Sequence, residues 1–191
     1  MKRFFVFLLV TAIILCFSSR IFAADRGLKP GLTLEEFKAY WEQAGKTPEG
    51  AVKCLIIAAL ETVKEGNKDG KKMWGMVLHK DYVDGKGEVS DRFAIEQCSR
   101  QIKGTDFKGA ILTSYLGGTP ENGYVCSYEN DLVVIQTQAI TDGEEVKIFI
   151  QSGGKDMATP VRLRKNKDGY WKIVEYSSVY TGVKPVDNKD F

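Results

Sequence analysis

Histidine is almost absent from this chain, which has a single one, His79, among its 191 residues. Cysteine is also scarce, with four residues and no Cys-x-x-Cys pair. A structural zinc site needs Cys or His ligands at close spacing, and the sequence offers no such cluster. A catalytic triad would have to use His79, and no nucleophile can be paired with it from spacing. We therefore expect no metal and no cofactor.

After residues 1–23, the sequence has no hydrophobic run long enough to span a membrane. This segment has two basic residues near its start and an apolar run over residues 4–17, which is typical of a secretory signal peptide. The run is shorter than the ~20 residues that a membrane anchor needs. A lipoprotein signal at Cys16 would require a small residue where the chain has Leu15. We predict cleavage before Ala24, no membrane span afterwards, and a periplasmic or secreted protein.

Strong net charge is missing as well. The chain has 27 basic and 25 acidic residues. The predicted signal peptide contains three of the basic residues and no acidic one, so the mature chain is close to neutral. Nucleic-acid binding favours a concentrated basic patch, and we therefore expect no nucleic-acid partner.

The cysteines that follow the predicted cleavage site are Cys54, Cys98 and Cys126. Three cysteines allow at most one disulfide within the chain, with three possible pairings. Cys54 and Cys98 lie in apolar helical patterns, which favours small buried hydrophobic residues rather than reactive thiols.

Helical signals fill the first half of the mature chain. Residues 33–36 have the Thr-x-x-Glu spacing of a capping box and predict a helix to Ala44. A Thr-Pro pair at 47–48 predicts a second start. The run 51–63 is apolar on nearly all sides, which is typical of a helix buried in the middle of a domain. Two further helices are expected, over 71–79 and over 91–102.

Strand and turn signals fill the second half. Asp-Gly pairs at 142–143 and 168–169 predict hairpins between β-rich runs. Residues 109–115 fit either a strand or a short helix. The expected strands are 124–128, 132–140, 145–151, 160–164 and 169–177.

Helices followed by antiparallel strands predict an α+β fold, with N-terminal helices packed on a curved sheet. We expect one domain over residues 32–181, a mobile lead over 24–31 and a loose tail over 182–191.

Two resemblances add to this prediction. Val161-Arg-Leu163 and Gly169-Tyr-Trp171-Lys-Ile173 resemble the last hairpin of the nuclear-transport-factor-2-like (SnoaL-like) superfamily. That resemblance implies a cystatin-like cone fold. The stretches 114–124, 150–154, 160–164 and 171–178 resemble an uncharacterised family of exported bacterial domains. That family has no assigned activity, so the resemblance implies fold and export alone.

The loop 114–124 is the first candidate for ligand binding, because binding residues concentrate on loops placed by a rigid scaffold. Its tyrosines would stack on a ligand and its polar side chains would donate or accept hydrogen bonds. The alternative is a structural Ω-type loop that closes the sheet. The candidate residues are Tyr115, Glu121, Asn122 and Tyr124.

Arg162 and Arg164 are the second candidate, because alternate strand residues share a face. They would form the floor of an anionic-ligand pocket, unless this face is simply solvated. We expect a non-catalytic exported domain that binds a small molecule, peptide or envelope protein between sheet and helices. The alternatives are a hydrolase-like or isomerase-like enzyme, with Glu175 or His79 as general base, and a purely structural envelope protein.

Overall fold

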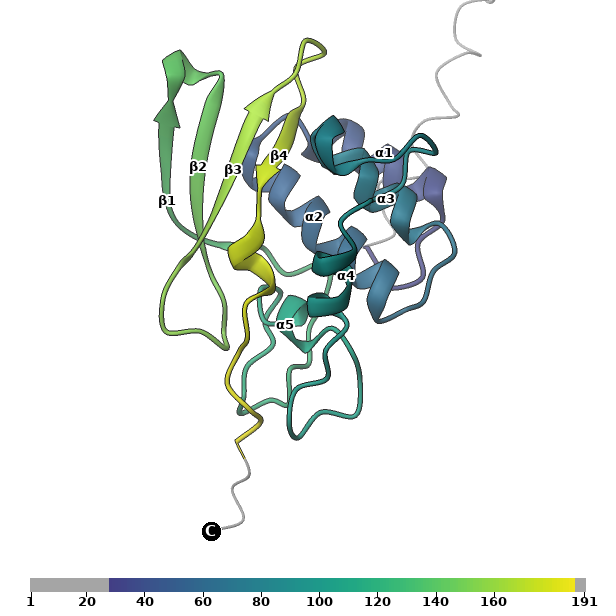
Figure 1. Cartoon of the computed structure of the whole chain (residues 1–191). Coiled ribbons are helices and arrows are strands. Elements are labelled where there is room, and N and C mark those ends of the chain that lie inside the picture. The colour runs from purple at the N-terminus through teal and green to yellow at the C-terminus, as the bar shows by residue number, and fades with distance from the viewer. Residues whose placement is uncertain (1–27, 188–191) are drawn as a thin grey trace, which may run out of the picture.

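The computed structural model describes residues 28–187, so the predicted signal peptide lies outside the described part of the chain. Helices come first in the described chain and are followed by one antiparallel sheet (Figure 1). The helices are α1 (Leu34–Ala44), α2 (Pro48–Val63), α3 (Gly70–Val77), α4 (Arg92–Cys98) and α5 (Ala110–Thr113). The strands are β1 (Val133–Ile140), β2 (Glu145–Gln151), β3 (Thr159–Lys165) and β4 (Trp171–Glu175).

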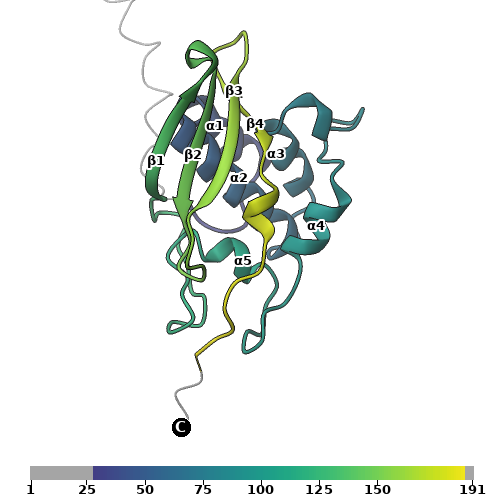
Figure 2. The same ribbon diagram turned by 60° about the vertical axis from the view of Figure 1, so that its left-hand side comes forward.

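The four strands form one sheet in the order β1-β2-β3-β4, and every neighbouring pair is antiparallel. Figure 2 shows the helices on one side of this sheet, with the other side uncovered. The predicted α+β class and the antiparallel meander are therefore confirmed. None of the helices in residues 28–187 is long and apolar enough to cross a lipid bilayer.

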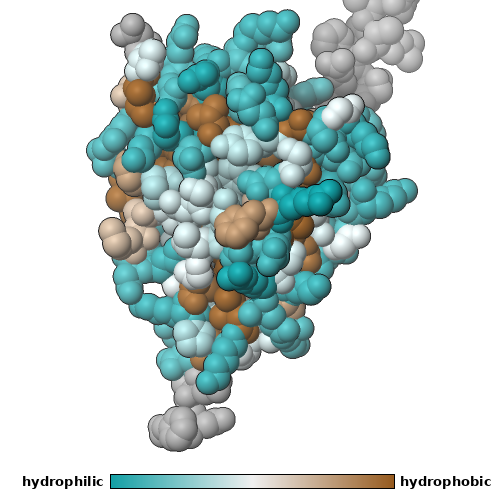
Figure 3. Space-filling model, viewed as in Figure 1, coloured by the Kyte–Doolittle hydropathy of each residue, from teal (hydrophilic) through white to brown (hydrophobic). Residues whose placement is uncertain are grey.

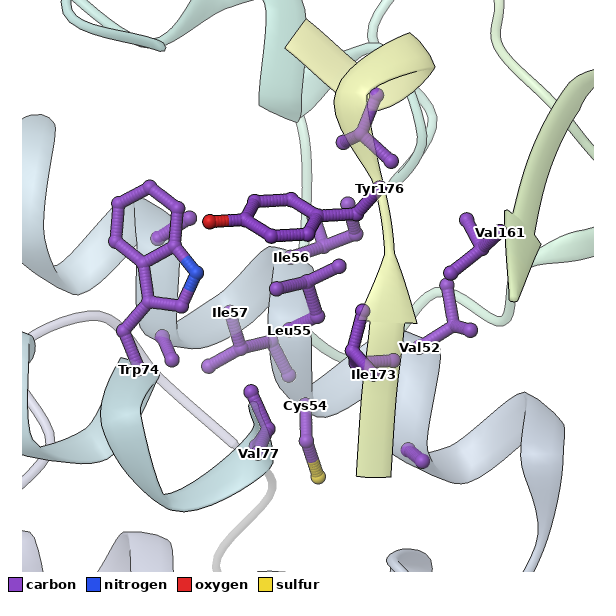
Figure 4. Packing of buried hydrophobic residues seen from close by; sticks show 14 of the residues in the cluster. Val52, Cys54, Leu55, Ile56, Ile57, Trp74, Val77, Val161, Ile173 and Tyr176 are labelled. Carbon is purple, nitrogen blue, oxygen red and sulfur yellow. The ribbon is translucent and has the colours of Figure 1, made fainter. Parts of the chain in front are cut away.

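Helix α2 is the centre of the hydrophobic core. Its apolar residues from Ala51 to Leu60 are all at most 1% exposed, which confirms the predicted core helix. Figure 4 shows its side chains between Ile173 of β4 and Trp74 of α3. The helix fills the concave side of the sheet, where sequence analysis placed the expected binding site.

The predicted helix starts are confirmed by their caps. The Thr33 hydroxyl accepts from the backbone N–H of Glu36 at 3.2 Å, and Glu36 accepts in return from the backbone N–H of Thr33 at 2.9 Å. This reciprocal pair is the predicted capping box. Thr47 caps α2 by accepting from the backbone N–H of Gly50 at 3.1 Å.

The predicted strand over 124–128 is wrong, because these residues form turns and irregular backbone. Tyr124 has φ of 64°, a left-handed conformation that interrupts extended chain. The backbone N–H of Ser127 bonds to the carbonyl of Leu116 instead of to a strand. Tyr124 and Tyr128 are buried and Val125 is exposed, but none of the described strands pairs with this segment.

Two predicted helices end earlier than expected. Helix α3 stops at Val77 because the next residues become extended and reach β4, with the His79 N–H bonded to the Ile173 carbonyl at 2.8 Å. Helix α4 stops at Cys98, where the Ser99 hydroxyl bonds back to the Ile95 carbonyl at 2.7 Å. The ambiguous segment 109–115 contains the short helix α5.

The chain on either side of the expected domain core is attached to it by hydrogen bonds. In the lead, the backbone N–H of Gly31 donates to the Glu61 carboxylate at 2.9 Å. In the expected tail, the N–H groups of Lys184, Val186 and Asp187 donate to backbone carbonyls at 3.0–3.1 Å. These bonds hold residues 31 and 184–187 against the rest of the domain.

Cys54, Cys98 and Cys126 are all free thiols. Cys54 and Cys98 are at most 1% exposed, and burial raises the pKa of both thiols. The prediction of small buried hydrophobic residues is confirmed for this pair.

Candidate functional site

A pocket of about 230 Å³ lies on the outer face of the sheet, where the segment after α3 meets the edge of β4. Two of its residues come from β3, one from β4, and three from the segment that follows α3. The lining residues are His79, Asp81, Tyr82, Arg162, Arg164 and Val174. The pocket therefore includes both arginines named from the sequence, together with the single histidine.

Strand β3 places the arginines by simple alternation. Val161 and Leu163 are fully buried against the helices, so Arg162 and Arg164 lie on the opposite face. In the register of the sheet, Glu145 of β2 lies directly opposite Arg164. A carboxylate and two guanidinium groups are thus brought together on the outer face.

Glu145 holds both arginines with one carboxylate. Its Oε1 accepts from Nε of Arg162 at 2.9 Å and its Oε2 accepts from Nη2 of Arg164 at 2.9 Å. The Glu145 side chain is buried beneath them, whereas the arginine side chains remain about half exposed. The hydrogen bonds from Arg162 and Arg164 hold the pKa of Glu145 below its usual range. The cluster has one positive charge in excess and N–H donors left to serve a ligand.

His79 reaches the pocket because the chain after α3 adds to the edge of β4, where Leu78 bridges Ile173 in parallel. Its Nδ1 accepts from the backbone N–H of Asp81 at 3.5 Å and lies 3.1 Å from Oδ2 of the same residue. His79 and Asp81 thus supply polar groups opposite the arginines.

Glu175 lies opposite Arg162 in the register of β3 and β4. Its carboxylate accepts from the Ser177 hydroxyl and from the Ser177 backbone N–H, and these bonds lower its pKa. A carboxylate with a lowered pKa is a weak base. This chemistry does not favour Glu175 as the general base of an enzyme.

Within residues 28–187, no group of three or more His, Cys, Asp or Glu side chains is arranged to hold a metal ion.

The tyrosines of the loop 114–124 lie inside the protein. The Tyr115 side chain is 2% exposed, and its hydroxyl bonds to the Thr159 hydroxyl at 2.9 Å and to the Val179 carbonyl at 3.1 Å. Tyr124 is fully buried and its hydroxyl donates to the Lys184 carbonyl at 2.6 Å. Both rings therefore contact the protein's own chain.

The two polar candidates of this loop, Asn122 and Glu121, lie in different surroundings. Asn122 accepts from the backbone N–H of Thr119 at 2.8 Å and donates to the carbonyl of Gly117 at 2.9 Å, so its side chain fastens the loop. Glu121 is exposed. The pocket on the outer face of the sheet is lined by other residues. The two sets of predicted site residues are therefore not brought together.

The loop 114–124 packs instead against the β2–β3 connection. The Ser152 hydroxyl donates to the Ser114 hydroxyl at 2.7 Å, and the Gly153 N–H donates to the Ser114 carbonyl at 2.8 Å. A Cβ on Gly153 would lie 2.3 Å from the Gly118 carbonyl oxygen. Two stretches that are far apart in the sequence thus form one tightly packed junction.

Lys155 adds further hydrogen bonds to this junction. Its ammonium donates to the Tyr115 hydroxyl at 2.7 Å and to the Ser178 carbonyl at 2.8 Å. Burial lowers the pKa of Lys155 to about 8. The lysine joins the loop, the β2–β3 connection and the C-terminal segment.

Removing the Tyr115 hydroxyl tests the structural role of this junction. Tyr115→Phe removes one of the hydrogen bonds of the Lys155 ammonium and takes away the partner of the Thr159 hydroxyl, so we expect a loss of about 1–2 kcal/mol in the free energy of unfolding. Tyr170→Phe is the matched control, because Tyr170 stacks on Trp41 at 5.7 Å through its ring. Urea unfolding measures both variants. Equal free energies of unfolding for Tyr115→Phe and Tyr170→Phe would contradict the structural role of the Tyr115 hydroxyl.

Sequence reasoning missed Glu145, which organises the site. The sequence signal for Glu145 is its position at the start of the predicted strand that becomes β2. Glu145, Lys147 and Phe149 share the outer face of that strand, and the hairpin sets Glu145 beside Arg164. This assignment depends on the register between the strands.

The stability of the cluster should depend on pH through Glu145. The pKa of Glu145 is lower in the folded protein than its ordinary value of 4.5. The ionised carboxylate therefore stabilises the fold at pH values above 4.5, and this contribution is lost as the pH falls through the folded-state pKa. We therefore expect Glu145→Gln to be less stable than the natural protein at pH 7. The difference should shrink progressively below pH 4.5.

Urea unfolding at several pH values checks this expectation. The matched control is Glu144→Gln, because Glu144 is the exposed neighbour in the sequence. A stability difference for Glu145→Gln that stays constant from neutral to acidic pH would contradict the role of the ionised carboxylate.

The comparisons with known proteins define the class to which this α+β domain belongs. Residues 31–187 match a family described as a domain of unknown function, DUF6935. The match covers most of the chain, so the chain belongs to this family. No curated protein matches the chain significantly. No solved structure matches it significantly either.

Proposed function

We propose that the protein is an exported, non-catalytic domain that binds a small acidic ligand in the pocket on the outer face of the sheet. The observation that carries the proposal is the arginine pair fixed by Glu145. Arg162 and Arg164 are each held at 2.9 Å by a different oxygen of that carboxylate. Held guanidinium groups bind carboxylates and phosphates with little loss of side-chain entropy.

The pocket suits a ligand of few atoms. Its volume of about 230 Å³ lies below the ~300–1,000 Å³ typical of sites for drug-sized molecules. Tyr82 and Val174 add apolar surface, and Asp81 adds an acceptor. This composition favours a short acid with a polar or apolar body over a highly charged polyanion.

The proposal places the ligand outside the concave side of the sheet, because α2 fills that space. It also favours binding over catalysis. Glu175 has a lowered pKa, and the residues lining the pocket include no Ser, Thr or Cys to act as nucleophile beside His79.

Export and the cone fold are parts of the same proposal. The apolar run over residues 4–17 supports a cleaved signal peptide. Helices packed on one side of an antiparallel sheet, with register shifts in its β1–β2 and β3–β4 pairs, support a nuclear-transport-factor-2-like cone. Mass spectrometry of the protein produced in bacteria tests export: we expect the mature chain to begin at Ala24.

Calorimetric titration with succinate and with inorganic phosphate tests the binding site. The variant Arg162→Gln/Arg164→Gln should bind at least about tenfold more weakly, since hydrogen bonds between charged groups contribute roughly 1.5–3 kcal/mol. Lys86→Gln/Lys167→Gln is the matched control, because it removes two exposed positive charges elsewhere. Equal weakening in both double variants would show general charge attraction, and would overturn the proposed site.

A further inference from the structure

One edge of the sheet is covered by another segment of the chain, and the other edge is open. The edge of β4 is covered by the segment after α3, where Leu78 bridges Ile173 and His79 donates to the Ile173 carbonyl at 2.8 Å. The edge of β1 lies at the other end of the strand order (Figure 1). Within residues 28–187, the backbone of β1 is hydrogen-bonded only to β2. The N–H and C=O groups of alternate β1 residues therefore face outward.

Strand β1 lacks most of the features that protect an edge strand. Its eight residues, Val-Val-Ile-Gln-Thr-Gln-Ala-Ile, include no charge and no proline. Val133 and Ile135 are 57% and 59% exposed. Hydrophobic atoms occur along the margin of the space-filling view where β1 lies (Figure 3). Charged residues, prolines and short length normally protect such an edge, and here only an irregularity between Val134 and Gln136 does so.

The charges at the ends of β1 indicate what can pair with it. Glu129 and Asp131 precede the strand and Glu144 follows it, and all three are exposed. Lys53 pairs with Asp131 at 3.1 Å, which neutralises one of them. A second copy of this chain, paired in either direction, would bring acidic ends beside acidic ends. A strand with basic ends would meet opposite charges.

We propose that the open edge of β1 accepts an extended peptide segment that is uncharged in its centre and basic at both ends. The segment adds a fifth strand to the sheet, and its backbone bonds to the outward-facing groups of β1. Eight residues of strand extend over about 26 Å. The partner therefore has an uncharged stretch of about eight residues, and the basic residues on either side of it lie about ten positions apart.

Two synthetic peptides test the charge requirement. Both have the eight-residue core Thr-Val-Thr-Val-Thr-Val-Thr-Val, with two lysines at each end of one and two glutamates at each end of the other. We expect the lysine peptide to bind at least about tenfold more tightly in fluorescence anisotropy, which corresponds to roughly 1.4 kcal/mol. Equal affinities would overturn the proposal.

Protein variants test the location. Ile135→Lys places a positive charge on the open strand and should weaken binding of the lysine peptide at least about tenfold. The matched control is Phe93→Lys, because Phe93 is 60% exposed on α4, outside the sheet. Equal binding by the two variants would overturn the assignment to β1. So would a dimer seen in sedimentation that Ile135→Lys abolishes, because a second copy would then occupy the edge.

Discussion

Replacing Ile57 with alanine is expected to lower the free energy of unfolding by about 2–5 kcal/mol, the usual effect of removing a large aliphatic side chain from a packed core. Ile57 is fully buried on α2, among side chains of α2, α3 and β4 (Figure 4). Neighbouring groups on the helix and the sheet cannot close the resulting space without moving, because protein interiors are close-packed.

The matched control for this substitution is Ile135→Ala on β1. The chemistry is identical, but Ile135 is 59% exposed, so the change should stay within about 0.5 kcal/mol. Urea unfolding of both variants measures the difference that burial makes. Similar losses in the two variants would contradict the placement of α2 in the centre of the core.

Replacing Glu61 with alanine should have a comparable effect for a different reason. This carboxylate is fully buried and accepts from the Gly31 N–H at 2.9 Å, from the Asn67 amide at 2.6 Å and from the Tyr128 hydroxyl at 3.0 Å. The three donors come from three separate segments. Removing their shared acceptor leaves the buried Tyr128 hydroxyl unpaired and breaks the links to Gly31 and Asn67, and we expect a loss of about 3 kcal/mol.

The comparison with Glu61→Gln separates the hydrogen bonds from the packing. Glutamine keeps the volume and one acceptor oxygen, so the loss should be smaller, about 1 kcal/mol. Glu42→Ala, at an exposed position of α1, should change the stability by less than about 0.5 kcal/mol. Thermal unfolding measures all three variants. An alanine variant at position 61 as stable as Glu42→Ala would show that Glu61 does not connect these segments.

The elements that depend on local sequence could be predicted. The capping box at Thr33 needs only a hydroxyl and a carboxylate three residues apart, and both lie in one turn. Helix α2 could be predicted from its composition, because a helix that is apolar on all sides has to be buried. The Asp-Gly pair at 142–143 lies in the turn Thr141–Gly143 that joins β1 to β2.

The elements that depend on a distant partner could not be predicted as well. Residues 124–128 have the β-rich composition of a strand, but a strand also needs a neighbour, and Tyr124 has a left-handed backbone instead. Alternation identified Arg162 and Arg164 as sharing one face. The position of Glu145 beside them depends on the register of β2 and β3. His79 reaches the same pocket through the parallel bridge of Leu78 to β4.

The junction around the loop 114–124 illustrates the same limit. Its glycines, tyrosines and polar residues are typical of a binding loop when considered alone. Their partners lie at the start of β3 and in the C-terminal segment, as the bonds of Tyr115 to Thr159 and of Tyr124 to Lys184 show. These contacts favour the structural alternative for the tyrosines, and ligand binding by the loop stays a prediction.

The most direct test of the proposed site is to map the backbone amide signals of the isotope-labelled protein during titration with succinate. The account predicts shifts at Arg162, Arg164 and the segment 79–82, which surround the pocket. These shifts should disappear in the Arg162→Gln/Arg164→Gln variant and persist in Lys86→Gln/Lys167→Gln. Shifts confined to the loop 114–124, with no change at the arginines, would contradict it.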